Sequence, residues 1–127
     1  ANEEWGAQTV GNQIGFDRTR IDLEFENRDA FDAKHMSELV NQAIESNLSV
    51  KMDFRPSQEL MEDPLVRINM DRMPPNIDVW RTISIGDLDV CPCAGTHVAQ
   101  TGDISPVEIT RVKSKGAGRL RIEYILN

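Results

Sequence analysis

The stretch CPCAGTHVAQTGDISPVEI, Cys91–Ile109, separates a predicted strand from the two strands that close the chain. Its glycines and prolines predict loops and turns rather than a helix. It also places both cysteines of the chain and one of its two histidines between positions 91 and 97. Metal binding, nucleophilic chemistry, a disulfide and plain packing are four competing interpretations of this segment.

Cys93 and His97 form a C-x-x-x-H pattern. In a turn rich in glycine and threonine, this spacing lets a thiolate and an imidazole converge on one ion, and zinc favours such ligands in a tetrahedral set of four. Two ligands make only half a site, so the pattern alone also fits a buried structural cysteine and a satisfied histidine. Cys91 lies one residue from Cys93, a spacing that strains a disulfide, and we expect it to pack.

A Cys–His nucleophile pair is the rival chemistry. It requires the imidazole within hydrogen-bond reach of the sulfur and a third group to orient the ring, and no recognisable signature of that kind is present. The second histidine, His35, lies beside Lys34 and outside the apolar face of a predicted helix, so we interpret it as a solvated helix residue.

The remaining pattern predicts an α+β fold, with one long and one short helix packed on a mainly antiparallel sheet. RIDLEF (20–25) alternates as a half-buried strand, and GAQTV before it is a candidate hairpin partner across the turn GNQIGFD. A helix begins after the N-cap Asp32, with Phe31 able to pack on Met36, and ends near Asn47. SQELMEDP suits a short helix capped by Ser57 and ended by Pro64. The other predicted strands are 50–54, 79–86, 107–114 and 118–126.

The composition suits one soluble domain of 127 residues, with 39% hydrophobic and 28% charged residues. A formal charge of −7 argues against a general nucleic-acid binder, although it leaves room for a local basic patch. The late segment RVKSKGAGRLR offers one, and it equally fits two solvated strand faces. No apolar run is long enough to span a bilayer and ANEEWGAQ is no signal peptide, so we expect a cytoplasmic protein.

The segment from Val90 to Leu126 resembles the C-terminal half of the alanyl-tRNA synthetase editing domain. The family pattern runs approximately P-C-x-G-T-H-V, then T-G-x-I-x-P-(aliphatic)-x-I, and closes with a glycine and R-x-I-E. The matching residues are Pro92, Cys93, Gly95, Thr96, His97, Val98, Thr101, Gly102, Ile104, Pro106, Ile109, Gly118, Arg121, Ile122 and Glu123. VNQAIESNLSV (40–50) is similar to the family's helix ending, and the short connections most resemble small freestanding editing proteins of the AlaX type.

The resemblance implies the fold of the second additional domain of threonyl- and alanyl-tRNA synthetases. It also implies a hydrolase that removes a wrongly attached amino acid, chiefly serine, from alanine tRNA. In that family the C-x-x-x-H pair, here Cys93 and His97, holds zinc together with an H-x-x-x-H pair. The metal either polarises the ester or holds substrate and water. Thr9 and Gln8 match the region that recognises the seryl group.

The resemblance to a tRNA enzyme favours the phosphate-binding interpretation of the basic segment, and Lys113, Lys115 and Arg119 are the candidate contacts. The chain departs from the family in having no H-x-x-x-H. Three explanations are open: the sequence is part of a longer protein, it is a relative that lost two of the ligands, or a partner chain supplies them. We favour the first.

We therefore expect a single editing-type domain over 1–127 that lacks the family's N-terminal metal-binding helix, and that binds zinc poorly and hydrolyses little as it stands. The alternative is a metal-free module that binds the tRNA acceptor stem.

Overall fold

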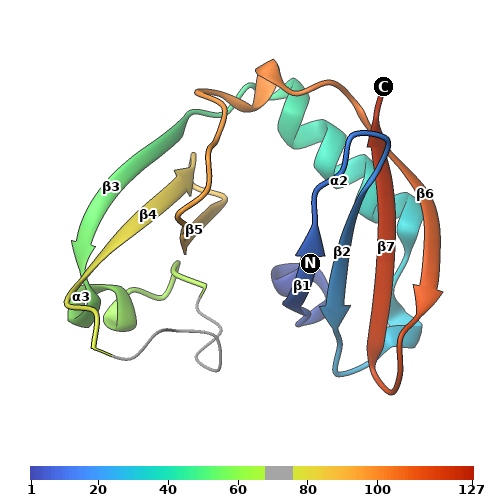
Figure 1. Cartoon of the computed structure of the whole chain (residues 1–127), viewed down its shortest axis with the longest axis horizontal. Coiled ribbons are helices and arrows are strands. Elements are labelled where there is room, and N and C mark those ends of the chain that lie inside the picture. Colours follow the sequence, from blue (N-terminus) through green and yellow to red (C-terminus); the bar gives the residue numbers. More distant parts are fainter. Residues whose placement is uncertain (68–75) are drawn as a thin grey trace. The chain divides into compact units, whose positions relative to one another are not determined.

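The computed structural model describes residues 1–67 and 76–127. These residues form two compact units, the first made of Ala1–Gln42 and Ser105–Asn127 and the second of Ala43–Ile104. The boundary falls inside the long helix α2 (Ala33–Glu45) (Figure 1). The single-domain organisation stays a prediction. Within the described part of the chain, no helix is long and apolar enough to cross a membrane.

The first unit contains a four-stranded antiparallel sheet (Figure 1). Its spatial order is β1 (Gln8–Gln13), β2 (Thr19–Glu24), β7 (Arg119–Leu126) and β6 (Val107–Ser114). Neighbours along the chain pair as hairpins, whereas β2 pairs with β7 from the other end of the sequence. The alternation in the sequence predicts β2, β6 and β7 to within one residue, and the α+β class is confirmed.

The core of the first unit lies on one face of this sheet. Register places Leu23 opposite Leu120 and Ile21 opposite Ile122, so branched side chains from the two ends of the chain share one face. The short helix α1 (Asn2–Trp5) adds an indole that meets Phe31 edge-on at 5.1 Å between ring centroids. Leu23 and Ile122 are each 1% exposed, which makes this pair the centre of the core.

The start of α2 follows the sequence prediction. The Asp32 carboxylate accepts hydrogen bonds from the backbone N–H groups of Lys34, at 2.9 Å, and His35, at 3.1 Å. Asp32 is therefore the N-cap, satisfying two donors that have no partner inside the helix. Phe31 and Met36 both pack against the core cluster, and the contact between the two stays a prediction.

The predicted turn GNQIGFD is shorter than its sequence indicates. β1 continues to Gln13, because the backbone from Gly11 onward pairs with β2 after a register shift next to Thr9. The extra residue is a β-bulge, which local glycine content does not reveal. Helix α1 lies outside the sequence prediction, because four residues are too few to show a helical period.

The second unit contains the sheet β3 (Val50–Pro56), β4 (Val79–Ile85) and β5 (Asp89–Pro92), in that order. β5 is a correction to the sequence-based prediction, which treats residues 87–106 as loop. It pairs antiparallel with β4, with Cys91 opposite Ile83. Four residues carry no readable alternation, and Pro92 is tolerated because β5 lies at the sheet edge.

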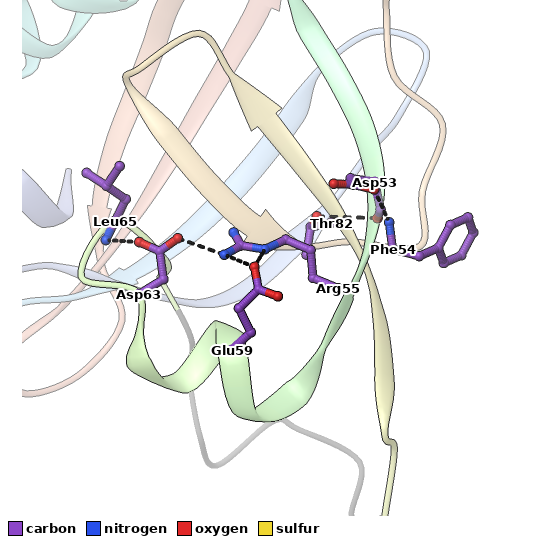
Figure 2. Close-up of polar contacts among 7 residues, drawn as sticks. All are labelled: Asp53, Phe54, Arg55, Glu59, Asp63, Leu65 and Thr82. Atoms are coloured by element: carbon purple, nitrogen blue, oxygen red, sulfur yellow. Dashed lines mark hydrogen bonds and ion pairs between the residues drawn. The ribbon is translucent and has the colours of Figure 1, made fainter.

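Helix α3 (Ser57–Glu62) confirms the predicted short helix. Pro56 rather than Ser57 is the N-cap, and it makes no side-chain cap bond. Figure 2 shows Arg55 on β3 holding the helix: its guanidinium donates to Glu59 at 2.9 Å and to Asp63 at 2.9 Å. The Leu65 N–H and this guanidinium keep the pKa of Asp63 below its usual value.

Thr101 anchors the segment after the C-x-x-x-H loop to residues of the second unit. Its hydroxyl donates to the Ala43 carbonyl at 2.7 Å and accepts from the Leu48 N–H at 2.7 Å. The Thr101 N–H donates to the Leu48 carbonyl at 2.9 Å. Since Thr101 is only 6% exposed, water cannot readily replace these partners.

Asn47 and Gly102 complete this anchor. Asn47 has φ 48°, the left-handed conformation predicted for the residue that ends the helix. Its side-chain oxygen accepts from the Gly102 N–H at 3.0 Å. A Cβ on residue 102 would overlap the Asn47 amide, so glycine is required by close approach. The T-G pair is therefore structural.

We predict that Thr101→Val lowers the free energy of unfolding by about 2 kcal/mol, because it strands a buried N–H and a buried carbonyl. Urea denaturation followed by circular dichroism measures this change. Thr110→Val is the matched control: Thr110 is exposed and its hydroxyl makes one long bond of 3.3 Å to the Glu123 carbonyl. A loss for Thr101→Val as small as the roughly 0.5 kcal/mol expected at the surface would contradict the anchor.

Candidate functional site

The loop that carries Cys93 and His97 is fixed at both ends within the second unit. At its start, the Cys93 N–H donates to the Arg81 carbonyl at 3.1 Å, which extends the pairing of β5 with β4. At its end, the Val50 N–H donates to the Ala99 carbonyl at 2.9 Å, and Gln100 bridges to Ser49. The loop is thus short, exposed and closed by backbone bonds.

Arg81, on β4, also contacts the inside of the loop. One terminal nitrogen of its guanidinium donates to the Cys93 carbonyl at 2.9 Å and to the Gly95 carbonyl at 2.7 Å. Its Nε donates to the Met52 sulfur at 2.9 Å. Two backbone carbonyls within the segment from Cys93 to His97 are therefore tied to one cation.

The imidazole of His97 has a defined orientation. Its Nδ1 lies 3.1 Å from the Gly95 carbonyl oxygen. Because a carbonyl only accepts, this bond requires the proton on Nδ1 and leaves the Nε2 lone pair of the neutral ring available to a ligand. This is the arrangement in which metal-bound histidines are usually held.

The side chains of both candidate ligands lie beside Gly95. A Cβ added there would lie 3.7 Å from the Cys93 sulfur and 3.9 Å from Cε1 of His97. Gly95 is not among the glycines with positive φ. Both distances are ordinary van der Waals contacts, so neither close approach nor a special turn conformation requires glycine at this position.

The donor set fits half of a zinc site. Thiolate and imidazole nitrogen are both zinc ligands, and a structural or catalytic site needs at least three protein ligands. Among residues 1–67 and 76–127, no group of three or more His, Cys, Asp or Glu side chains is placed to hold a metal ion. Cys93 and His97 can accordingly supply two ligands of a larger set.

The other histidine is engaged elsewhere. His35 Nε2 donates to the Glu4 carboxylate at 3.1 Å, and the ring meets Trp5 edge-on at 5.8 Å between centroids. This agrees with its interpretation as a helix-surface residue. The contact with Trp5 adds a packing role that the sequence pattern does not indicate.

Cys91 is a half-buried thiol on β5, and both cysteines are free. Burial, reinforced by the neighbouring Asp89 carboxylate, raises the pKa of Cys91 to about 11. A thiol held protonated in this way is a poor nucleophile and a poor ligand. The structure thus agrees with the prediction that Cys91 packs.

Gln8 and Thr9 lie on β1 in the first unit, opposite Glu24 and Leu23 respectively. Gln8 lines a small open cavity of about 260 Å³, together with Gly6, Glu24, Phe25 and Glu26. Cys93 and His97 lie in the second unit. The structure therefore brings Cys93 together with His97 and Gln8 together with Thr9, each pair within its own unit.

The basic residues gather on the β6–β7 hairpin of the first unit. Lys113 lies opposite Arg121, and the positive charges of Arg121 and Lys113 lower the pKa of Lys115. Arg119 is partly neutralised, because its Nε lies 3.4 Å from the Glu24 carboxylate. Lys113 and Lys115 make no ion pair among the described residues.

Two arginines that are not among the predicted tRNA contacts lie near the same hairpin. Arg28 donates to the Ser114 hydroxyl at 2.6 Å and to the Gly116 carbonyl at 3.2 Å, at the tip of the hairpin. Arg20, on β2, is close enough to affect the pKa of Lys115. Their separation in sequence hides the cluster, which depends on the pairing of β2 with β7.

Known proteins match both the motif region and the whole chain. The family model described as the threonyl and alanyl tRNA synthetase second additional domain matches residues 80–123. The alanyl-tRNA editing protein AlaX-M of Saccharolobus solfataricus is 31% identical over 127 residues, which cover 98% of this chain and 52% of that protein. The AlaX-M protein of Methanosarcina acetivorans is 30% identical, with 98% and 51% covered.

Over residues 80–123 the chain is similar to the editing domain of alanyl-tRNA synthetases, and over nearly its whole length it is similar to editing proteins of the AlaX type. It spans about half the length of the AlaX-M relatives that it matches. It is also 34% identical over 116 residues to the alanine–tRNA ligase of Haloquadratum walsbyi, covering 12% of that enzyme. The AlaX-type motif residues Cys93, Gly95 and His97 lie in the loop described above, and Thr101 and Gly102 form its anchor.

We predict that Cys91 reacts slowly with iodoacetamide at pH 8.5 and faster as the pH rises toward 11, because only the thiolate attacks. Single-cysteine variants, Cys93→Ser to observe Cys91 and Cys91→Ser to observe Cys93, separate the two thiols by mass spectrometry. A Cys91 rate that follows the ordinary thiol pKa of about 8.5 would contradict its burial.

The burial of Cys91 also makes the free energy of unfolding depend on pH. Because the raised pKa favours the neutral thiol in the folded state, this contribution is complete below the ordinary thiol pKa and is lost as the pH rises from about 9 to about 11.

Proposed function

We propose that this chain supplies half of the metal site, and a tRNA-binding surface, of a zinc-dependent hydrolase that deacylates mischarged alanine tRNA. The observation that carries the proposal is the pairing of the Cys93 sulfur and the His97 ring beside Gly95, with the His97 Nδ1–H turned to the Gly95 carbonyl. The editing proteins and the ligase matched by the chain support tRNA as the substrate class.

Cys93 Sγ and His97 Nε2 would hold the zinc, and the H-x-x-x-H pair expected from the resemblance would supply the other ligands. When bound, zinc supplies a Lewis acid for the ester carbonyl or an activated water. The chain's own part is to hold the sulfur and the ring beside Gly95, through the Gly95 carbonyl and the backbone bonds that close the loop.

We assign recognition of the seryl group to Thr9 and Gln8. Both are exposed on β1 and present polar groups able to bond to a hydroxyl. Glu26, with Glu24 partly neutralised by Arg119, gives the cavity beside Gln8 a negative lining, which suits the α-ammonium group of an esterified amino acid. The cytoplasmic location inferred from the sequence is part of the same proposal.

We assign contacts to tRNA phosphates to Lys113 and Lys115, with a smaller part for Arg119. The first two present unpaired ammonium groups on the hairpin, within the part of the chain that the structure describes, whereas Arg119 already has Glu24 as a partner. A protein with a net charge of −7 would otherwise repel a polyanion, so binding must depend on such a local surplus of cations.

The metal proposal predicts that Cys93→Ala lowers deacylation of seryl-tRNA at least about 100-fold. Removing a residue that only orients a metal ligand already costs about 10- to 100-fold, and removing the ligand itself costs more. Release of serine from mischarged alanine tRNA is measured on the full-length protein, with and without a chelator. Cys91→Ala is the matched control and should keep its activity. Activity that survives both Cys93→Ala and chelation would refute the zinc mechanism.

The tRNA surface predicts that the double variant Lys113→Ala/Lys115→Ala weakens tRNA binding and reduces the slope of log K against log salt by about 2, one unit for each phosphate that is no longer neutralised. Filter binding at several salt concentrations measures the slope. Lys34→Ala is the control, because that exposed lysine lies on α2 and pairs with Glu38. An unchanged slope would remove the hairpin from the interface.

The same measurements decide on the alternative function. A metal-free module for the tRNA acceptor stem predicts salt-sensitive binding with no hydrolysis by the full-length protein, in either the presence or the absence of zinc. The lysine variants would then weaken binding, and Cys93→Ala would change nothing.

A further inference from the structure

We propose that Arg81 is a positioning residue that presets Cys93 and His97 for the metal; this inference rests on the proposed function. Arg81 lies on β4, outside the C-x-x-x-H pattern, and no polar atom of its side chain is needed as a ligand. Its side chain acts on the metal site through backbone carbonyls of the loop.

The contacts of Arg81 converge on the loop from both its side chain and its backbone. The guanidinium donates to the carbonyls of Cys93 and Gly95, at 2.9 and 2.7 Å, and the Arg81 carbonyl accepts from the Cys93 N–H at 3.1 Å. Residue 93 is thus held through the peptide groups on both sides of its Cα. A residue held in this way has few directions left for its Cα–Cβ bond, which sets where the sulfur points.

The Gly95 carbonyl links Arg81 to His97. That oxygen accepts from the guanidinium at 2.7 Å and from Nδ1 of His97 at 3.1 Å, so both of its lone pairs are used. Arg81 fixes the direction of the oxygen, and the oxygen fixes the tautomer and plane of the imidazole. Without Arg81, this carbonyl can rotate toward water in an exposed loop.

Arg81 is itself well held, as a positioning group must be. Its backbone lies inside the central strand β4, opposite Phe54 of β3. Its Nε donates to the Met52 sulfur, which fixes the plane of the guanidinium. No ion pair of Arg81 with a carboxylate is found among the described residues, so its charge is directed at the two carbonyls rather than neutralised by an acid.

Arg55 offers a matched comparison in the same sheet. It is also a partly buried arginine whose guanidinium spans two acceptors, but these are the carboxylates of Glu59 and Asp63 at helix α3 (Figure 2). Its register partner is Trp80, so its guanidinium serves the helix and not the loop from Cys93 to His97. Loss of Arg55 therefore tests the general effect of removing an arginine from this sheet.

The first experiment titrates Co²⁺ into the full-length protein and follows the thiolate-to-metal charge-transfer absorption. We expect Arg81→Met to bind Co²⁺ about 10- to 100-fold more weakly, the range typical for removal of a group that orients a metal ligand, with a changed absorption band. Arg81→Lys should lose less, since an ammonium keeps the charge and can reach one of the two carbonyls. Arg55→Met should leave Co²⁺ affinity unchanged.

The second experiment needs no metal. Nitrogen-15 NMR of the metal-free protein reports the tautomer of His97, and we expect the Nδ1–H form in the wild type and in Arg55→Met. In Arg81→Met the neutral ring should redistribute between the two tautomers. Thermal denaturation is recorded for each variant, and Arg81→Lys replaces Arg81→Met if the latter does not fold.

The outcomes separate this inference from the proposed function. Wild-type protein that binds no Co²⁺ would overturn the metal proposal and leave the tautomer measurement to decide on Arg81. Unchanged Co²⁺ affinity in Arg81→Met would overturn the positioning role. The role would also be overturned if His97 were the Nε2–H tautomer in the wild type, or if its tautomer did not respond to Arg81→Met. An equal loss of Co²⁺ affinity in Arg55→Met and Arg81→Met would also overturn the positioning role, because Arg81 would then affect the site only through the stability of the sheet.

Discussion

The candidate site depends on the two hydrogen bonds made by the buried hydroxyl of Thr101. This hydroxyl bonds the Ala43 carbonyl and the Leu48 N–H at once, so the segment that follows the loop cannot leave without stranding two backbone groups. Gly102 closes against Asn47 beside it, where no larger residue fits. The T-G pair, which reads in the sequence as a turn, is therefore the fixed end of the C-x-x-x-H loop.

The other end of the loop is fixed by β4. Between these two ends the chain makes no regular structure, and Gly95 supplies the oxygen that orients His97. The loop is thus an exposed segment held by a buried frame, the usual way in which a rigid scaffold presents reactive side chains to solvent. One guanidinium directed at two carbonyls adds precision that backbone pairing at the ends alone does not provide.

Strand register, rather than nearness in the sequence, decides which charged side chains of the first sheet pair with one another. Arg121 makes two bonds to Asp22, at 2.7 and 3.0 Å, which holds the pKa of that carboxyl below its usual value. Arg119 likewise faces Glu24. These ion pairs neutralise Arg121 and Arg119, which face β2. Among the described residues, the charges of Lys113 and Lys115 on the hairpin have no acidic partner. An acidic chain can therefore carry a cationic hairpin without a basic composition.

The sequence by itself determined the α+β class, the helix after Asp32, most strands, and Cys93 and His97 as a pair, because alternation, capping and ligand spacing are local properties. It did not reveal β5, the extent of β1 or the roles of Arg81, Arg20 and Arg28. Those depend on which strands pair, and pairing joins residues about 100 positions apart, as Asp22 and Arg121 illustrate. Only the tertiary structure decided that the Gly95 carbonyl is shared by Arg81 and His97, because that contact needs the loop to close over β4.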